Sequence, residues 1–344
     1  MAMQDPGTVS SGGTRGNAAQ RQRMSLLIRP AIAGLLLLIT LLGLVGTAIR
    51  DPRPHDIPVG LVGPPPAVQQ ISSAFAANAP GAFEFTSYGS EADARAALDS
   101  RGVDAALVLG GSAPVLIVAG AAGDATTGVI TAAFTNVFKA QGGTINVEVV
   151  HPFAAGDAHG LILFFVVVAV IISTMVAQAL LFVVASWAGF TVRLTVVVVY
   201  AVLAGLVGMG MATWIAGDYG SGFWTAAALV MLASAAVGAT VAGAARLLGL
   251  PGLGLAALVV VLLDLVSSGG PVGSQLLPDF YRWLAPWMPA GEMYDALRGA
   301  LYFDGAALER PIAVLSGWLA GGILLLLLGE LVSRRRPVVA APAA

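Results

Sequence analysis

Six long stretches with no acidic or basic residue, apart from one terminal histidine, constrain this chain more than any other feature. They run over residues 30–49, 159–192, 194–217, 219–245, 247–263 and 311–329. A hydrocarbon core about 30 Å thick is crossed by roughly 20 apolar residues of helix. Because a backbone in lipid must satisfy its own hydrogen bonds, such stretches form helices. The sequence therefore predicts a polytopic α-helical membrane protein with about six transmembrane helices.

Composition and the placement of charge support this prediction and suggest an orientation. The chain is 57% hydrophobic and 10% charged, whereas soluble domains average about a quarter charged residues. Arginines precede the first span, follow the last, and lie at Arg193 and Arg246 after spans two and four. The positive-inside rule places all these sites, and both termini, in the cytoplasm, although Arg50 and Arg53 oppose it. Abundant Ala, Val and Gly, with Lys139 as the single lysine, indicate a bacterial plasma membrane protein.

The sequence divides into five segments. These are a disordered cytoplasmic tail at 1–24, a first transmembrane helix at 25–50 that serves as an uncleaved signal anchor, an extracytoplasmic α/β domain at 51–158, a five-helix membrane domain at 159–335, and a cytoplasmic tail at 336–344. The α/β prediction rests on strand-like runs at 57–62, 105–109, 115–118 and 145–150, which alternate with helical spacing. Ser90, followed by acidic residues, marks one helix start.

Two polar side chains inside the predicted spans are candidates for a transport site or a structural site. Asp264 lies near the outer end of span five, where it could be hydrated or paired with Arg282 or Arg298. It could have this structural pairing or a helix-end role, or it could be part of a transport or proton pathway. Gln178 in span two, with Ser173 and Thr174 nearby, is suited to hydrogen bonds between helices.

Two further groups of residues have an expected place in the membrane. Ala235, Ala239 and Gly243 recur at i, i+4 spacing, and we expect them at a helix–helix contact within or between protomers. The segment 267–304 is rich in aromatic residues and proline, which predicts broken helices that lie at the outer membrane interface or partly re-enter the membrane. Trp283, Trp287 and Arg298 are its candidate anchoring residues, with substrate binding as the alternative.

Several classes of activity lack their required residues. A phosphate-binding loop needs a lysine after its glycines, and Lys139 lies outside any such loop, so an ATPase would have to be a separate subunit. The three histidines have no metal-ligand spacing and there is no cysteine, so we expect no metal site. No catalytic constellation or cofactor motif is present, which predicts a non-enzyme. The net charge of −2 gives no reason to expect nucleic acid binding.

The complete pattern resembles a known superfamily. The outer domain opens with IPVGLV at 57–62, and the stretch after span five reads SSGGP at 267–271, LPDF at 277–280, PWMP at 286–289 and ALR at 296–298. With one span, an outer α/β domain and five further spans, the chain resembles the ABC type-2 permease-like superfamily, and is most similar to its phage-infection-protein branch. This resemblance implies a permease-like membrane protein.

One departure from the superfamily bears on energy coupling. Permeases that work with an ATPase usually carry a charged helix between spans two and three, whereas residues 186–193 here are short and hold only Arg193. Two functions therefore stay open. The first is a component, expected to be a homodimer in contact with membrane lipids, for export of a hydrophobic or amphiphilic molecule such as a lipid, drug or envelope precursor. The second is a non-transporting receptor or scaffold whose outer domain binds an envelope component, a partner protein or a phage.

Overall fold

The computed structural model describes residues 32, 34–48, 50, 52–110, 113–185 and 187–335. The predicted tails at 1–24 and 336–344 lie outside the described residues, as does most of 25–33. The chain forms two compact units, with the boundary between Thr47 and Ala48. In the first unit, the described part of the predicted signal anchor is an apolar helix, Gly34–Ala48.

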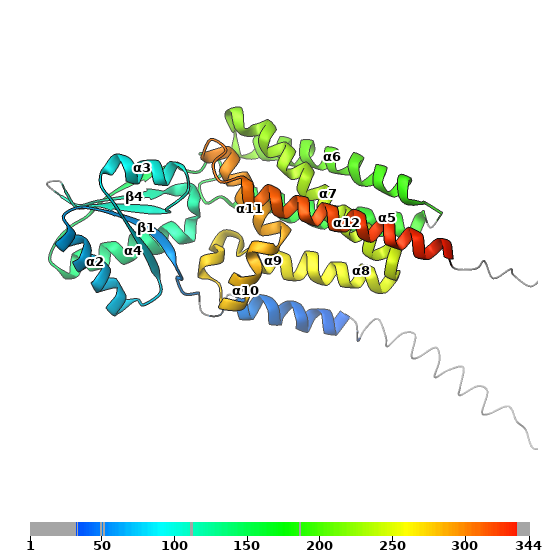
Figure 1. Cartoon of the computed structure of the whole chain (residues 1–344), viewed down its shortest axis with the longest axis horizontal. Coiled ribbons are helices and arrows are strands. Elements are labelled where there is room, and N and C mark those ends of the chain that lie inside the picture. Colours follow the sequence, from blue (N-terminus) through cyan, green and yellow to red (C-terminus); the bar gives the residue numbers. More distant parts are fainter. Residues whose placement is uncertain are drawn as a thin grey trace, which may run out of the picture. The chain divides into compact units, whose positions relative to one another are not determined.

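A five-stranded mixed sheet forms the centre of the α/β domain, in the order β2-β1-β3-β4-β5 (Figure 1). β1 pairs in parallel with β2 and β3, β4 pairs in parallel with β5, and only β3 and β4 are antiparallel. The parallel pairs need crossover connections, which the helices supply. The elements are β1 (Ile57–Val62), α2 (Pro65–Asn78), β2 (Phe83–Tyr88), α3 (Glu91–Asp99), β3 (Ala105–Val108), β4 (Val115–Ala119), α4 (Asp124–Ala140) and β5 (Asn146–Val150).

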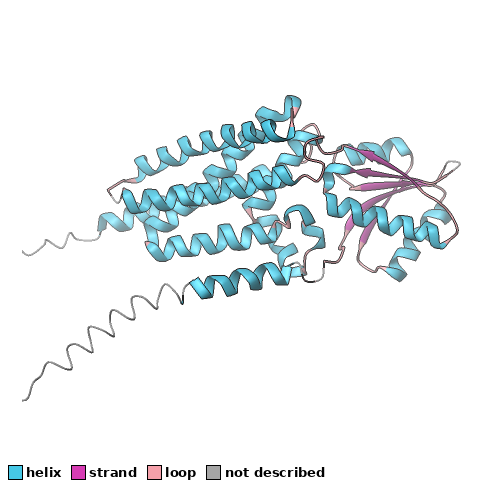
Figure 2. Ribbon diagram, turned by 180° about the vertical axis from the view of Figure 1, so that it is seen from behind, coloured by secondary structure: helices cyan, strands magenta, loops and turns pink. Residues whose placement is uncertain are grey.

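Helices cover both faces of this sheet (Figure 2). Phe75 of α2 and Phe134 of α4 pack on one face, with ring centroids 4.6 Å apart, and Leu98 of α3 packs on the other face. The Ser90 start signal is confirmed, because its hydroxyl accepts the Asp93 N–H at 3.1 Å and so satisfies a donor that the first turn leaves unpaired. The α/β pattern expected at 51–158 is therefore present.

The remainder of the described chain is a bundle of membrane helices. Five segments are long and apolar enough to cross a membrane: Leu161–Val184, Phe190–Ala216, Gly220–Leu248, Leu250–Val272 and Glu309–Ser333. They correspond to α5 (Leu161–Val184), α6 (Phe190–Ala216), α7 (Phe223–Leu248), a segment composed of α8 (Leu250–Ala256), a π-helix (Ala257–Leu263) and α9 (Asp264–Ser267), and α12 (Glu309–Arg335). The protein is thus a polytopic helical membrane protein.

Helix α7 lies at the centre of the bundle, since 72% of its most apolar window is buried against 22–39% for the other four segments. Its small residues allow α12 to approach closely. A Cβ placed on Gly243 would lie 2.7 Å from the Cβ of Leu325, and one on Gly322 would lie 2.5 Å from the backbone nitrogen of Thr240. Ala239 is fully buried at this contact, and Ala235 packs beside it. The small residues singled out in the sequence therefore join α7 to α12 within one protomer.

Polar contacts also form at the end of the bundle away from the α/β domain, the position of which can be followed in Figure 1. Arg246 of α7 pairs with Glu330 of α12 at 3.0 Å. Arg193, only 1% exposed, donates from its Nε to the carbonyl of Ala188 at 2.9 Å and from its Nη2 to that of Ala185 at 3.2 Å. These bonds fasten the short connection between α5 and α6.

The segment 267–304 is broken, as its prolines predict, and its exposed large apolar side chains lie before α11. It begins at Ser267, the last residue of α9, and contains α10 (Asp279–Leu284) and α11 (Pro289–Tyr302), with 3₁₀ turns between these helices. The side chains of Trp283 and Trp287 are 67% and 62% exposed. By contrast, α11 packs against α5, α7 and α12, so this helix of the segment is buried within the bundle. Its nine buried residues include small ones that allow tight packing.

Candidate functional site at the junction of the two domains

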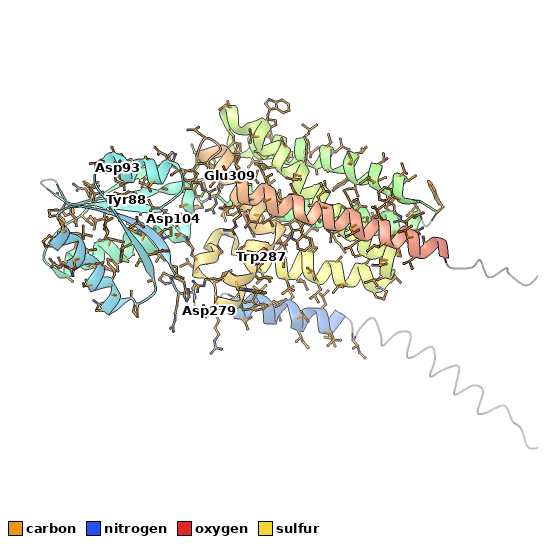
Figure 3. The ribbon with its side chains drawn as sticks, in the orientation of Figure 1. Tyr88, Asp93, Asp104, Asp279, Trp287 and Glu309 are labelled. Atoms are coloured by element: carbon orange, nitrogen blue, oxygen red, sulfur yellow. The ribbon has the colours of Figure 1, made fainter. Side chains whose placement is uncertain are left out.

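The α/β domain contacts the bundle through two apolar groups. Leu276, from the connection after α9, belongs to the domain core beneath α4. Phe303, directly after α11, belongs to the core on the α3 face. Between these two contacts, the end of the sheet at which the central strand β3 starts faces the bundle. Figure 3 shows Asp104, directly before β3, at this end of the sheet.

A polar cavity of about 290 Å³ lies at this junction. Both parts of the chain line it, and most of the lining side chains are charged, hydroxyl-bearing or small. The lining residues of the α/β domain are Pro58, Arg101, Asp104, Ala122, Gly123 and Thr126. The other lining residues lie between α9 and α11, in α11, or in α12. They are Ser268, Gly270, Pro271, Gly273, Ser274, Gln275, Ala285, Gly291, Glu292, Tyr294, Asp295, Arg298 and Arg310.

Asp295 of α11 is the centre of the contact between the domains. It pairs with Arg101, at the end of α3 in the α/β domain, and with Arg298 at 2.8 Å on its own helix. Burial alone would raise the pKa of Asp295, but the two arginines outweigh burial and hold this pKa below its usual range. Arg298 also donates to the backbone carbonyl of Ala122. Asp295 is therefore ionised at neutral pH and ties α11 to the α/β domain.

Glu292, one turn before Asp295, is buried with one oxygen unpaired. Its side chain is 4% exposed, and its Oε1 accepts from Nη2 of Arg310 at 2.6 Å. Its Oε2 has no hydrogen-bond partner among the described residues, and neither does the Nε of Arg298. Burial raises the pKa of Glu292, which the positive charge of Arg310 partly opposes. Since buried polar atoms are normally paired, these two atoms indicate an incomplete set of hydrogen bonds.

Asp104 and Gln275 form a second link between the domains. Gln275 Nε2 donates to Asp104 Oδ2 at 3.0 Å, and burial raises the pKa of Asp104. The cavity thus brings together three arginines and three carboxylates, with both donors and acceptors available to a ligand. Within the described residues, no group of three or more His, Cys, Asp or Glu side chains is placed to hold a metal ion.

Asp264, the acid that the sequence singles out, lies just outside this cavity. It is fully buried, and its Oδ1 accepts from the backbone N–H of Ala290 at 2.7 Å, in the first turn of α11. A carboxylate at a helix N-terminus satisfies a free donor and interacts favourably with the helix dipole. The arginines considered as its partners pair with other acids, Arg282 with Asp56 at 2.9 Å and Arg298 with Asp295, because those acids lie closer to them in the folded chain.

Gln178 is buried, and its amide has no hydrogen-bond partner among the described residues. The interhelical hydrogen bond expected near it forms one turn earlier, between Thr174 and Ser234 at 2.9 Å. Neither Asp264 nor Gln178 lines the cavity, and of the predicted interfacial residues only Arg298 does.

The charged and amide residues that sequence reasoning missed are Arg101, Asp104, Gln275, Glu292, Asp295 and Arg310. One local signal was present, because Glu292, Asp295 and Arg298 recur every three residues within a segment of low charge. That spacing places the three side chains along one side of a helix. The residues from the α/β domain gave no such signal, since Arg101 and Asp295 are 194 positions apart.

The fold and the cavity define a class: a polytopic helical membrane protein whose α/β domain, inserted before the helical bundle, forms a polar site with it. The chain belongs to the family described as "Protein of unknown function (DUF3533)", which matches residues 133–324. The matched region includes Glu292, Asp295 and Arg298, but it begins after Arg101 and Asp104. No curated protein and no solved structure matches the chain.

Proposed function

We propose that this protein is a component for the export of a hydrophobic or amphiphilic molecule across a bacterial plasma membrane. The observation that carries the proposal is the polar cavity at one end of the membrane helices, bordered by two domains and holding unpaired buried polar atoms. Such a cavity can receive the polar part of an amphiphile while the apolar part stays among the helices. In this proposal the α/β domain is extracytoplasmic and both termini are cytoplasmic.

Two features of the bundle support a moving part next to the cavity. The segment Leu250–Val272 contains a seven-residue π-helix immediately before Asp264, and π-helical turns recur at functional sites. Asp264 then caps α11, whose other residues line the cavity. A shift of this segment would therefore displace α11 and change the cavity. The likeness to ABC type-2 permeases supports the same proposal, with a homodimer as the working unit.

A receptor or scaffold is the second candidate, and one observation favours it. The connection between α5 and α6 comprises only residues 185–189 and forms no helix in its described part, so a surface for docking a separate ATPase is lacking there. In this case the α/β domain would bind an envelope component, a partner protein or a phage without transport.

Transport of a labelled lipid between leaflets separates the two candidates. The purified chain is reconstituted into liposomes that contain a fluorescent short-chain phospholipid, and the loss of fluorescence after adding an impermeant quencher is followed. Export activity predicts faster equilibration than in protein-free liposomes, with slowing by Arg101→Ala, which opens the domain junction. The export proposal is wrong if two results are found together. Equilibration with the purified chain stays at the rate of protein-free liposomes, and membranes of native cells that overproduce the chain move the lipid no faster than membranes of cells that do not.

A further inference from the structure

Helix α12 carries a continuous stripe that begins at the polar cavity. Arg310 lines the cavity, and the residues three, four, seven and eleven positions later line an apolar groove of about 710 Å³: Ala313, Val314, Gly317 and Gly321. Residues at this spacing lie on one face of a helix. The cavity and the groove are therefore consecutive parts of one helix face.

The groove is open where the glycines lie. A Cβ placed on Gly317 or Gly321 meets no atom of the described part of the chain within 4 Å, so these residues leave space in front of both glycines. Trp287 and Trp318 border the groove, and the Nε1 of Trp318 donates to the carbonyl of Trp287 at 2.7 Å. From Arg310 to Leu328 the helix rises about 27 Å at 1.5 Å per residue, which is long enough for an acyl chain in one leaflet.

The charges around the cavity indicate what the polar end of an occupant would be. Arg101, Arg298 and Arg310 balance Asp104, Glu292 and Asp295, so an occupant with a large net charge would be poorly matched. Among the described residues, Glu292 Oε2 is a buried acceptor without a donor, and Arg298 Nε is a buried donor without an acceptor. An occupant that satisfies both atoms must itself offer a donor and an acceptor.

We propose that the cavity and the groove together bind one amphiphile with a zwitterionic headgroup, which bears a hydrogen-bonding ammonium and an acidic phosphate. The ammonium donates to Glu292 Oε2. The phosphate accepts from Arg298, near the N-terminus of the 17-residue helix α4, whose Gly123 and Thr126 line the cavity and whose first-turn N–H groups favour an anion. The acyl chain lies along α12 over Gly317 and Gly321.

This proposal rests on the proposed function in that it names the class of molecule which the exporter would handle, but binding can be measured without transport. The full chain is placed in nanodiscs of equal parts phosphatidylethanolamine, phosphatidylcholine and phosphatidylglycerol, extracted, and analysed by native mass spectrometry for retained lipid. Phosphatidylethanolamine supplies ammonium N–H donors, phosphatidylcholine has none, and phosphatidylglycerol lacks the cation. The expected result is one retained phosphatidylethanolamine per protomer, preferred about tenfold, as one charged hydrogen bond predicts.

Two variants test the two ends of the site. Glu292→Gln keeps the size of the side chain but removes its charge, and the preference for phosphatidylethanolamine over phosphatidylcholine should fall about tenfold. Gly321→Leu fills the groove, and retention of all three lipids should fall. Gly210→Leu on α6 is the matched control, because a Cβ there also meets no atom within 4 Å and Gly210 does not line the groove; its lipid retention should equal that of the unmodified protein.

Equal retention of the three lipids by the unmodified protein, or unchanged retention in Gly321→Leu, overturns the proposal. If Glu292→Gln fails to fold, the Gly321→Leu and Gly210→Leu pair still decides whether the groove holds the chain. A protein that moves labelled lipid between leaflets but shows no headgroup preference refutes only this inference. Selective retention without movement refutes only the export function.

Discussion

The close contact between α7 and α12 predicts opposite effects for two adjacent glycines. A Cβ on Gly322 would lie 2.5 Å from the nitrogen of Thr240, and 2.7 Å and 2.9 Å from the carbonyl carbon and Cβ of Ala239. Two of these three atoms belong to the backbone, so no change of rotamer relieves the clash, and α7 and α12 must move apart. A Cβ on Gly321 meets nothing within 4 Å.

The expected magnitudes follow from these distances. Overpacking of a close contact costs about 1–3 kcal/mol, and Ala in a helix gains about 1 kcal/mol over Gly. Gly322→Ala should therefore lower the free energy of unfolding by up to about 2 kcal/mol, because the gain in helix propensity offsets part of the overpacking cost. Gly321→Ala should leave this free energy unchanged or raise it by up to about 1 kcal/mol.

Unfolding in mixed micelles with increasing fractions of a denaturing detergent, followed by circular dichroism and tryptophan fluorescence, measures both changes. The two variants differ from each other by a shift of one position, so composition and helix propensity are matched. Equal stability of the two variants, or a Gly321→Ala protein that is the less stable one, would refute the close packing of α7 on α12. Ala239→Leu should behave like Gly322→Ala, because it enlarges the opposite side of the same contact.

Three other perturbations test the topology, the helix cap and the domain junction. Because the chain has no cysteine, an impermeant maleimide added to intact cells should label Gln141→Cys in the exposed α/β domain and spare Trp187→Cys at the other end of the bundle; the reverse result would invert the orientation. Asp264→Ala should lower the free energy of unfolding by about 1–2 kcal/mol, because the α11 cap is lost. Asp264→Asn keeps an acceptor and should unfold nearly like the unmodified protein. The same Asn variant should reduce export if the charge belongs to the transport pathway, and it should have no effect if the protein is a receptor. The pKa of Asp295 is lowered in the folded protein, so its contribution to stability should be complete above the unfolded pKa and lost as the pH falls through the folded pKa. Hydrogen exchange at the domain junction should therefore rise in acid. An Arg101→Ala protein with the same acid response would contradict this role of the ion pair.

The sequence by itself determined the parts of this protein that depend on local pattern. Uncharged runs define membrane helices, since each must satisfy its backbone within lipid, and five of the six predicted spans appear as full-length helices in the described chain. The first predicted span is described only over Gly34–Ala48, so a sixth crossing stays a prediction. The alternation in 51–158 likewise defined the strands and helices around Phe75, Leu98 and Phe134, because periodicity reports which face is buried.

Only the tertiary structure decided the partners of the charged residues. Asp264 binds the backbone of Ala290, and Arg298 binds Asp295, although arginine pairing with Asp264 was an equally reasonable prediction. Arg101 meets Asp295 across 194 positions. These pairs depend on how the α/β domain docks on α11, and docking is set by non-periodic contacts such as Phe303 in the α3-face core. No local spacing encodes such contacts.

The glycines show the same division between sequence and structure. Gly321 and Gly322 are identical and adjacent in the sequence, and small-residue spacing marks both as possible packing sites. Both glycines border the groove, but Gly322 lies against Ala239 and Thr240, whereas a Cβ on Gly321 would meet no atom of the described residues within 4 Å. A rotation of about 100° per residue separates the two faces of α12, and only the position of α7 decides which face is covered.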